Sequence, residues 1–400
     1  MSSTLDSRLR DELAAAERDG TRKLRHVIDS PQGPEVEMQG HGRVLVMSSN
    51  DYLGLAGHPQ VIQAGIEGLR RYGAGTASVR FICGLFTPHL DLERELAEFL
   101  GTEAALTFSS AWAANEATIP ALCDPGTWIL SDELNHASIV DAIRLSRPTR
   151  KVVYPHADVD ALEAELAQAP ADARRLVISD GVFSMEGDLA PLPALVAACR
   201  RHDAILVLDD SHGTGVLGPA GRGTAEHFGL AHEVDVTVST LGKALGGAAG
   251  GFVAASQAVC EMLEQRARPQ LFSNALAPSV ACSARAALGI LRAEPERVAR
   301  IHRGVARLRE RILEQGLKPL GGDSGIVPVL VGDTALAIAA SASMLESGVF
   351  ATGFGYPVVP EGTARVRLQV SAAHEEEQLD RAAAAIGRAV SALTAADAER

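Results

Sequence analysis

The sequence lacks most features that mark specialised classes of protein. Its five cysteines are scattered and form no C-x-x-C pair, which favours reduced thiols in a cytoplasmic protein and predicts no metal site. No run of about 18 apolar residues occurs, so we expect no membrane span. The first residues lack a basic segment followed by an apolar one, so no secretory signal is predicted. Acidic residues also outnumber basic ones, 50 to 37, and the resulting net charge of −13 argues against nucleic acid or an anionic membrane as a partner.

What the chain does contain is enough apolar residues for a large core. Its 400 residues are 46% hydrophobic, which predicts two domains in one compact unit. We expect an N-terminal helix and arm over residues 1–45, a large α/β domain over 46–290 and a small C-terminal α+β domain over 291–400.

Short apolar runs alternate with helical patterns through the large domain, which favours an α/β fold with a mainly parallel sheet covered on both faces. The expected strands are Ala105–Phe108, Trp128–Leu130, Lys151–Tyr154, Leu176–Ser179, Ala204–Leu208, Val234–Val238 and Gly251–Ala254. The small domain is expected to contain helices over Pro295–Gln315, Thr334–Ser347 and from Glu375 onward, with strands at Ile326–Val331 and Arg365–Val370.

The chain is expected to open with an amphipathic helix, because Leu5, Leu9, Leu13 and Ala16 recur at helical spacing before Gly20. This helix is predicted to pack on the body of the protein or on a second subunit.

Two segments carry the strongest chemical signal. Lys243 lies among glycines, which leave room for a bulky group near the backbone, and Asp209 ends an apolar strand, where an unpaired charge is costly. A lysine that forms a Schiff base and a carboxylate for a pyridinium nitrogen are what pyridoxal 5'-phosphate (PLP) requires. Each segment alone could be a glycine-rich turn or a strand end. Together, with His212 close behind Asp209, they favour a PLP site.

Further candidates are weaker when each is taken alone. His136 follows an expected strand and could stack on the cofactor ring, although a loop histidine is more often solvated. The small residues that begin at Ser110 lead from a strand into a helix, where backbone N–H groups attract phosphate, or where Ser110 is simply an N-cap. Thr240 could also bind the phosphate. Arg365 and Arg367 share one face of a strand, and one of them could hold a substrate carboxylate.

These residues resemble the motifs of the α-oxoamine synthases, which are PLP enzymes of fold type I that join an amino acid to an acyl-CoA. The resemblance extends over nearly the whole chain. Its main motifs are Ser49–Leu55 (SNDYLGL), Asp180–Gly187 (DGVFSMEG), Asp209–His212 (DDSH) and Thr240–Lys243 (TLGK). Within the family, the segments that look most like glycine C-acetyltransferases are Ala77–Gly84, Arg266–Pro278, Tyr356–Pro360 and Ser371–His374.

The resemblance implies a homodimer with shared active sites and a role for each matching residue. Lys243 would form the Schiff base, His136 would stack on the ring, and Asp209 would meet the pyridinium, with His212 and Ser184 near the phenolic oxygen. The implied phosphate ligands are the backbone around Ala111 and Trp112, Thr240 and, across the interface, Ser273 and Asn274. The implied substrate residues are Arg367, Asn50 and Ser78.

One stretch departs from the acetyltransferase pattern. Acetyltransferases tend to carry Ser-Cys-Phe-Asp-Ala-Asn where this chain has Ser110–Asn115 (SAWAAN), so the aromatic residue is larger and an acid is lost. The Ala-Ala-Asn is nearer to 8-amino-7-oxononanoate synthase. The acetyltransferase-like segments predict glycine and acetyl-CoA as substrates. The departure at Ser110–Asn115 leaves another amino acid or acyl thioester as the alternative, and an aminotransferase is a more distant one.

Overall fold

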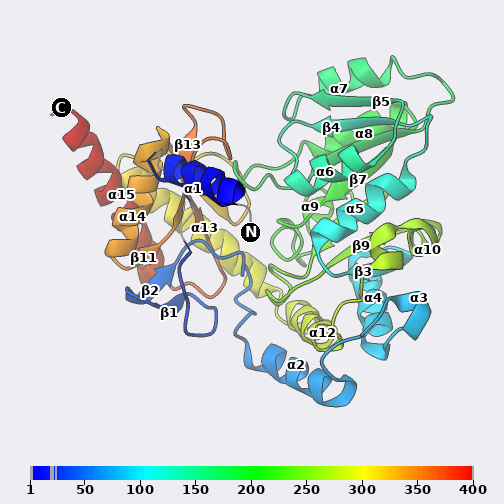
Figure 1. Cartoon of the computed structure of the whole chain (residues 1–400), viewed down its shortest axis with the longest axis horizontal. Helices are drawn as coiled ribbons and strands as arrows, with labels where there is room; N and C mark the ends of the chain where they lie inside the picture. Colours follow the sequence, from blue (N-terminus) through cyan, green and yellow to red (C-terminus); the bar gives the residue numbers. More distant parts are fainter. Residues whose placement is uncertain (1–2, 19–21, 23–24, 399–400) are drawn as a thin grey trace.

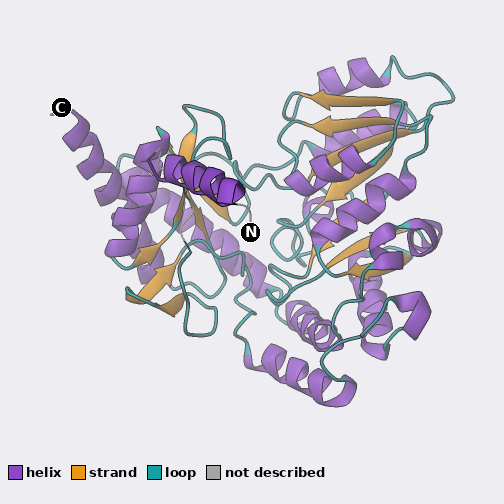
Figure 2. Cartoon of the chain, viewed as in Figure 1, coloured by secondary structure: helices purple, strands orange, loops and turns teal. Residues whose placement is uncertain are grey.

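A large sheet with helices on both faces dominates one half of the molecule, and two small sheets lie in the other half (Figures 1 and 2). The computed structural model describes residues 3–18, 22 and 25–398. The α/β class predicted from the sequence is confirmed. Within the described residues, no helix is both long and apolar enough to cross a membrane.

The large sheet has seven strands in the order β3-β9-β8-β7-β6-β4-β5. The five strands from β8 to β5 are parallel, whereas β9 is antiparallel to both of its neighbours. The expected strands are therefore present, with slightly different ends. Their bounds are β3 Ala104–Phe108, β4 Trp128–Asp132, β5 Arg150–Tyr154, β6 Arg175–Asp180, β7 Ile205–Asp209, β8 Val236–Thr240 and β9 Gly251–Ala255.

The parallel strands are buried on both faces because their successive side chains enter different cores. In β6, Leu176 belongs to the core beneath one set of helices and Val177 to the core beneath another. The helices of this half are α2 Pro59–Tyr72, α3 Arg80–Cys83, α4 Thr87–Leu100, α5 Ala111–Leu122, α6 Ala137–Leu145, α7 Val159–Leu166, α8 Leu192–Arg201, α9 Thr224–His227, α10 Gln257–Arg266, α11 Arg268–Phe272 and α12 Pro278–Ala293.

The other half joins segments from both ends of the chain. The strands form two sheets, β1-β2-β11 and β10-β13-β12. Their bounds are β1 Glu35–Met38, β2 Gly42–Val46, β10 Ile326–Gly332, β11 Val349–Phe350, β12 Thr352–Phe354 and β13 Ala364–Gln369, and the helices are α13 Glu296–Glu314, α14 Thr334–Glu346 and α15 Glu376–Ala398. Because Leu45 of β2 pairs with Val349 of β11, the N-terminal arm is joined to C-terminal strands. The domain boundaries at 46 and 291 remain predictions.

The N-terminal helix forms as expected, as α1 Ser3–Arg18, but its apolar side is not covered by the body. Leu5, Leu9 and Leu13 are 57%, 46% and 53% exposed. These side chains are therefore not fully packed against the body of the same chain, and packing on a second subunit stays a prediction. Gly20, which was expected to end the helix, lies outside the described residues.

Candidate functional site

A polar cavity of about 220 Å³ lies at the carboxyl ends of the parallel strands. This is where open α/β sheets ordinarily bind ligands. Eight residues predicted from the sequence line it: Ala111, Trp112, His136, Ser184, Asp209, His212, Thr240 and Lys243. Wider surface hollows of about 720, 710 and 730 Å³ occur elsewhere, but none of them contains a predicted site residue.

Lys243 follows β8 and points its amine toward an imidazole. Its Nζ lies 2.8 Å from Nε2 of His212. Burial lowers the pKa of Lys243 from 10.5 to about 8, although Asp209 and Asp180 favour the charged form, and Arg367 lowers it further. Burial likewise lowers the pKa of His212 well below 6.5, so this imidazole is neutral at pH 7. The lysine is therefore unusually ready to become a nucleophilic amine.

Asp209, the last residue of β7, is held as an oriented carboxylate. Its Oδ2 accepts a 2.6 Å hydrogen bond from Nδ2 of Asn115 on α5, and its Oδ1 accepts one from the backbone N–H of Ser211. The Oγ of Ser211, which lines the cavity, is buried without a hydrogen-bond partner within the described part of the chain. A buried polar atom of this kind calls for a ligand or water.

His136 is the N-cap of α6 and also lines the cavity. Its backbone N–H donates to Oδ2 of Asp180 at 3.0 Å, and its Nδ1 lies 2.8 Å from Oγ of Ser138. Burial lowers its pKa, which leaves a neutral ring. The indole of Trp112 meets this ring edge to face, with the centroids 6.0 Å apart.

Trp112 is 40% exposed and donates from Nε1 to Oε1 of Glu116. This exposure is too high for a residue that merely fills the core.

The N-terminus of α5 opens beside this wall and offers free backbone N–H groups. Ser110 is its N-cap and accepts a hydrogen bond from the N–H of Ala113. A Cβ on Gly251 would lie 2.3 Å from N of Ala111, so only glycine lets β9 approach the helix so closely. Thr240 accepts a hydrogen bond from the N–H of Gly242. A phosphate fits this end of the cavity because helix N-termini attract anions.

Both candidate arginines of β13 reach the loop that follows β6. Arg365 donates from Nη1 to Glu186 Oε1 at 2.8 Å and is only 4% exposed, so its charge is already paired. Arg367 donates from Nη1 to the carbonyl of Ser184, while its Nε is buried without a partner among the described residues. Its guanidinium carbon lies 4.8 Å from the centroid of the Phe354 ring. Within the described part of the chain, Arg367 therefore has a buried N–H donor, Nε, without a partner, and this donor is available to a ligand.

Several predicted residues lie outside the cavity lining. Asn50 accepts a hydrogen bond from Gln369, and Ser78 lies in the loop between α2 and α3, where its carbonyl accepts from Thr76. Ser273 and Asn274 are exposed, just after α11. Their predicted contact with a second subunit is not tested by a single chain.

The structure also adds residues that sequence reasoning did not assign. Asn115 orients Asp209, and Asp180 binds the backbone of His136. The hydroxyl of Tyr52 lies 2.8 Å from Nδ1 of His212, and Gln369 donates to that hydroxyl. Tyr52 and Asp180 belong to recognised motifs, which was the signal available for them. Within the described ranges, no group of three or more His, Cys, Asp or Glu side chains could hold a metal ion.

The chain is similar to known proteins over most of its length. Residues 43–386 match the family model of aminotransferase class I and II. The chain is 48% identical over 370 residues to an 8-amino-7-oxononanoate synthase of Geobacter sulfurreducens, covering 92% of this chain and 93% of the relative. It is 44% identical over 389 residues to the mitochondrial 2-amino-3-ketobutyrate coenzyme A ligase of Homo sapiens, covering 96% and 93%. A structure of S. paucimobilis serine palmitoyltransferase with bound PLP–myriocin matches 99% of this chain and 100% of its own, at 29% identity and a TM-score of 0.92.

Proposed function

The chain belongs to the class I and II aminotransferase family and, within it, to the α-oxoamine synthases, and we propose that it condenses glycine with acetyl-CoA. The products would be 2-amino-3-oxobutanoate and coenzyme A. The family is PLP-dependent and uses amino-acid and acyl thioester substrates, so PLP is the cofactor. The single observation that carries the proposal is the buried Lys243 amine, whose Nζ lies 2.8 Å from Nε2 of His212 in a cavity that Asp209 also lines.

The residues of the cavity suit PLP at each of its ends. Lys243 would hold it covalently, Asp209 would pair with the ring nitrogen, and the neutral ring of His136 would lie against its face. The N-terminus of α5 and Thr240 would bind the phosphate. When bound, PLP supplies a ring that accepts electrons from the Cα–H bond of an attached amino acid.

The chain's own groups then account for the remaining steps. Arg367 would hold the carboxylate of glycine through its unpartnered Nε, and this contact would orient the Cα–H bond. The Lys243 amine, once free, would remove the proton from Cα, since it is neutral more readily than an ordinary lysine. The deprotonated carbon would then attack the thioester carbonyl, the C–S bond would break, and coenzyme A would leave as the thiol by taking up the proton that Lys243 had removed.

Glycine and acetyl-CoA are favoured by the segments that resemble acetyltransferases, together with the 44% identity to the human ligase. A specific observation supports the alternative of a biosynthetic synthase with another amino acid or acyl thioester. The relative at 48% identity is an 8-amino-7-oxononanoate synthase, and the Ala113–Asn115 stretch is nearer to those enzymes. An aminotransferase is the more distant alternative.

We also propose that the protein acts as a homodimer with shared active sites. An exposed apolar side chain beside the predicted interface residues Ser273 and Asn274 supports this proposal: Phe272 is 69% exposed. The cytoplasmic location stays a prediction, since the human relative is described as mitochondrial.

The deciding experiment is a matrix of amino acids against acyl-CoA thioesters, read by the release of free thiol. Glycine, alanine and serine would each be combined with acetyl-CoA, longer acyl-CoAs and a terminally carboxylated acyl-CoA. We expect the highest kcat/KM for glycine with acetyl-CoA. A higher value for alanine with the carboxylated thioester would support the alternative instead. Amino transfer to a keto acid without thiol release would indicate an aminotransferase.

A further inference from the structure

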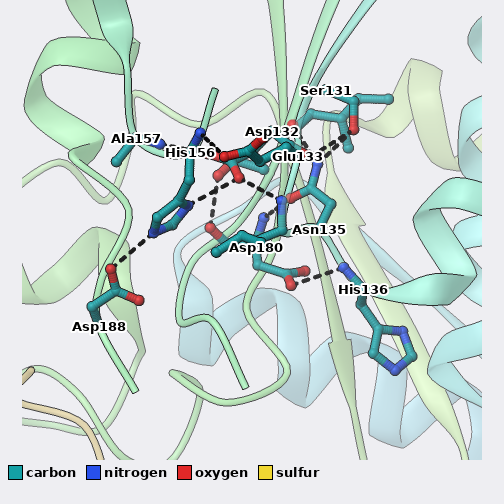
Figure 3. Close-up of polar contacts among 12 residues, drawn as sticks. Ser131, Asp132, Glu133, Asn135, His136, His156, Ala157, Asp180 and Asp188 are labelled. Carbon is teal, nitrogen blue, oxygen red and sulfur yellow. Dashed lines mark hydrogen bonds and ion pairs between the residues drawn. The ribbon is translucent and has the colours of Figure 1, made fainter. Parts of the chain in front are cut away.

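A third histidine lies outside the cavity lining and takes no part in the proposed chemistry. His156 follows β5, and its ring is held at both nitrogens by carboxylates: Nδ1 lies 3.0 Å from Asp132 and Nε2 lies 2.9 Å from Asp188. The ring also packs edge-on against Phe183, with centroids 4.3 Å apart. Figure 3 shows His156 between the two carboxylates, with Asn135 and Asp180 on the side that leads to His136.

The contact to Asp132 reaches the wall of the cavity that carries His136. Asp132 ends β4, and its carboxylate also accepts hydrogen bonds from the backbone N–H groups of Leu134 and Ala157. Asn135, which belongs to the same turn, accepts a hydrogen bond from the backbone N–H of Asp180. The carboxylate of Asp180 in turn accepts a hydrogen bond from the backbone N–H of His136. The position of His136 therefore depends on a turn whose first residue is bound by His156.

The contact to Asp188 reaches the other wall. The carbonyl of Asp188 accepts a hydrogen bond from the N–H of Phe183, and this closes the loop that contains Ser184. Ser184 lines the cavity, and its carbonyl binds Arg367. The same loop is therefore held by His156 at one end and by Arg367 at the other.

We propose that His156 is a positioning residue, which ties the turn carrying His136 to the loop carrying Ser184 and so fixes two walls of the cofactor cavity. The inference rests on the proposed function only for the identity of the cofactor and is independent of the choice of substrates. His156 is not among the residues that line the cavity, so we expect it to act on the cofactor only through its neighbours.

The charge of His156 is what makes it able to hold both walls. Burial alone would lower its pKa, but the hydrogen bonds to Asp132 and Asp188 outweigh burial and raise the pKa to about 10. Glu133, which accepts from the backbone N–H of His156, adds a further negative charge on the same side. Both ring nitrogens carry protons at neutral pH, so each carboxylate receives a charge-assisted hydrogen bond.

The test compares His156→Gln with a matched control, His302→Gln. His302 is also a partly buried histidine, and its Nε2 lies 2.9 Å from the backbone carbonyl of Val216. It lines the surface hollow of about 710 Å³ and not the candidate cavity. The Kd for PLP would be measured by titrating the apoprotein. We expect it to rise about tenfold in His156→Gln, the factor for losing one charge-assisted hydrogen bond, and less than about twofold in the control.

A second readout separates positioning from a general loss of stability. Hydrogen exchange should become faster at the amide of His136 in His156→Gln, whereas the amide of Val207, in the centre of the sheet, should keep its protection. In the wild-type protein, NMR titration should show the His156 ring still protonated at pH 8. These measurements need no turnover, so they would stand even if the substrate proposal failed.

If His156→Gln does not fold, Asp188→Asn provides the same test, because the two side chains have nearly the same size and that of Asp188 is 38% exposed. It should weaken PLP binding in the same direction by about threefold. The proposal is overturned if PLP binds unchanged in the folded variants, if the control loses as much affinity, or if His156 titrates near 6.5.

Discussion

The pKa of Lys243 gives the sharpest prediction, because it decides when the lysine can react. An ordinary lysine with a pKa of 10.5 is neutral in about one molecule in a thousand at pH 7.5. With a pKa of about 8, roughly a quarter of the molecules carry a neutral amine at the same pH. The cavity therefore increases the reactive fraction about 200-fold.

The rate at which the apoprotein captures PLP covalently should follow this fraction. We expect the rate, followed by stopped-flow absorbance from pH 6 to 10, to rise and then level off with a midpoint near pH 8. The sign follows from the direction of the shift: burial lowers the pKa, so the neutral amine appears at lower pH than in an exposed lysine. Borohydride reduction and peptide mapping would identify the site, and the sequence has only four lysines to distinguish.

A matched variant tests the cause of the shift. Arg367 is one of the charges that lower the pKa of Lys243, so Arg367→Gln should move the midpoint to higher pH. A capture rate that keeps rising beyond about pH 9.5 without a plateau would refute the reasoning, as would reduction of PLP onto another lysine.

Three substitutions test the other roles. Asp209→Asn should still bind PLP but slow the exchange of the amino acid's α-proton about a hundredfold; exchange at the wild-type rate would contradict the pairing with the ring nitrogen. Arg367→Ala should raise KM for the amino acid about 10- to 150-fold with little change for acyl-CoA, and a larger effect from Arg365→Ala would reassign the carboxylate contact. Trp112→Phe should change the ranking of substrates by a factor corresponding to roughly 1–3 kcal/mol, with little loss of Tm because the indole is 40% exposed. An unchanged ranking with a lower Tm would mean that Trp112 serves packing.

The large sheet could be predicted from the sequence because its signal is local. Strands buried on both faces are continuous apolar runs, and Leu176–Ser179 is typical of them. The small sheets gave a weaker signal. β11 has only two residues, and its partner Leu45 lies some 300 positions earlier, so no local pattern indicates the pairing. Nothing in the amino-acid composition of β9 indicates that it runs antiparallel to its neighbours.

The candidate site divides in the same way. Lys243 and Asp209 could be recognised because reactive groups stand out from the small or apolar residues around them. The roles of Asn115, Tyr52 and His156 could not be assigned, even though Tyr52 lies in a recognised motif, because each acts through residues from other parts of the chain. The contact of Tyr52 with His212, for example, spans 160 positions. A buried polar residue shows its purpose only when its partner is known.

These contacts indicate which part of the site can change most easily between this protein and its relatives. The proposed amino-acid end of the site is tied into the fold, because Arg367 donates to the loop carbonyl of Ser184 and the nearby Arg365 is paired with Glu186. A change at that end would disturb several buried contacts at once. Trp112 is different: it is 40% exposed, and its indole donates one hydrogen bond to Glu116 and meets the His136 ring edge to face. Changes there cost little stability, so we expect differences in acyl preference between this protein and its relatives to arise at Trp112 rather than at Arg367.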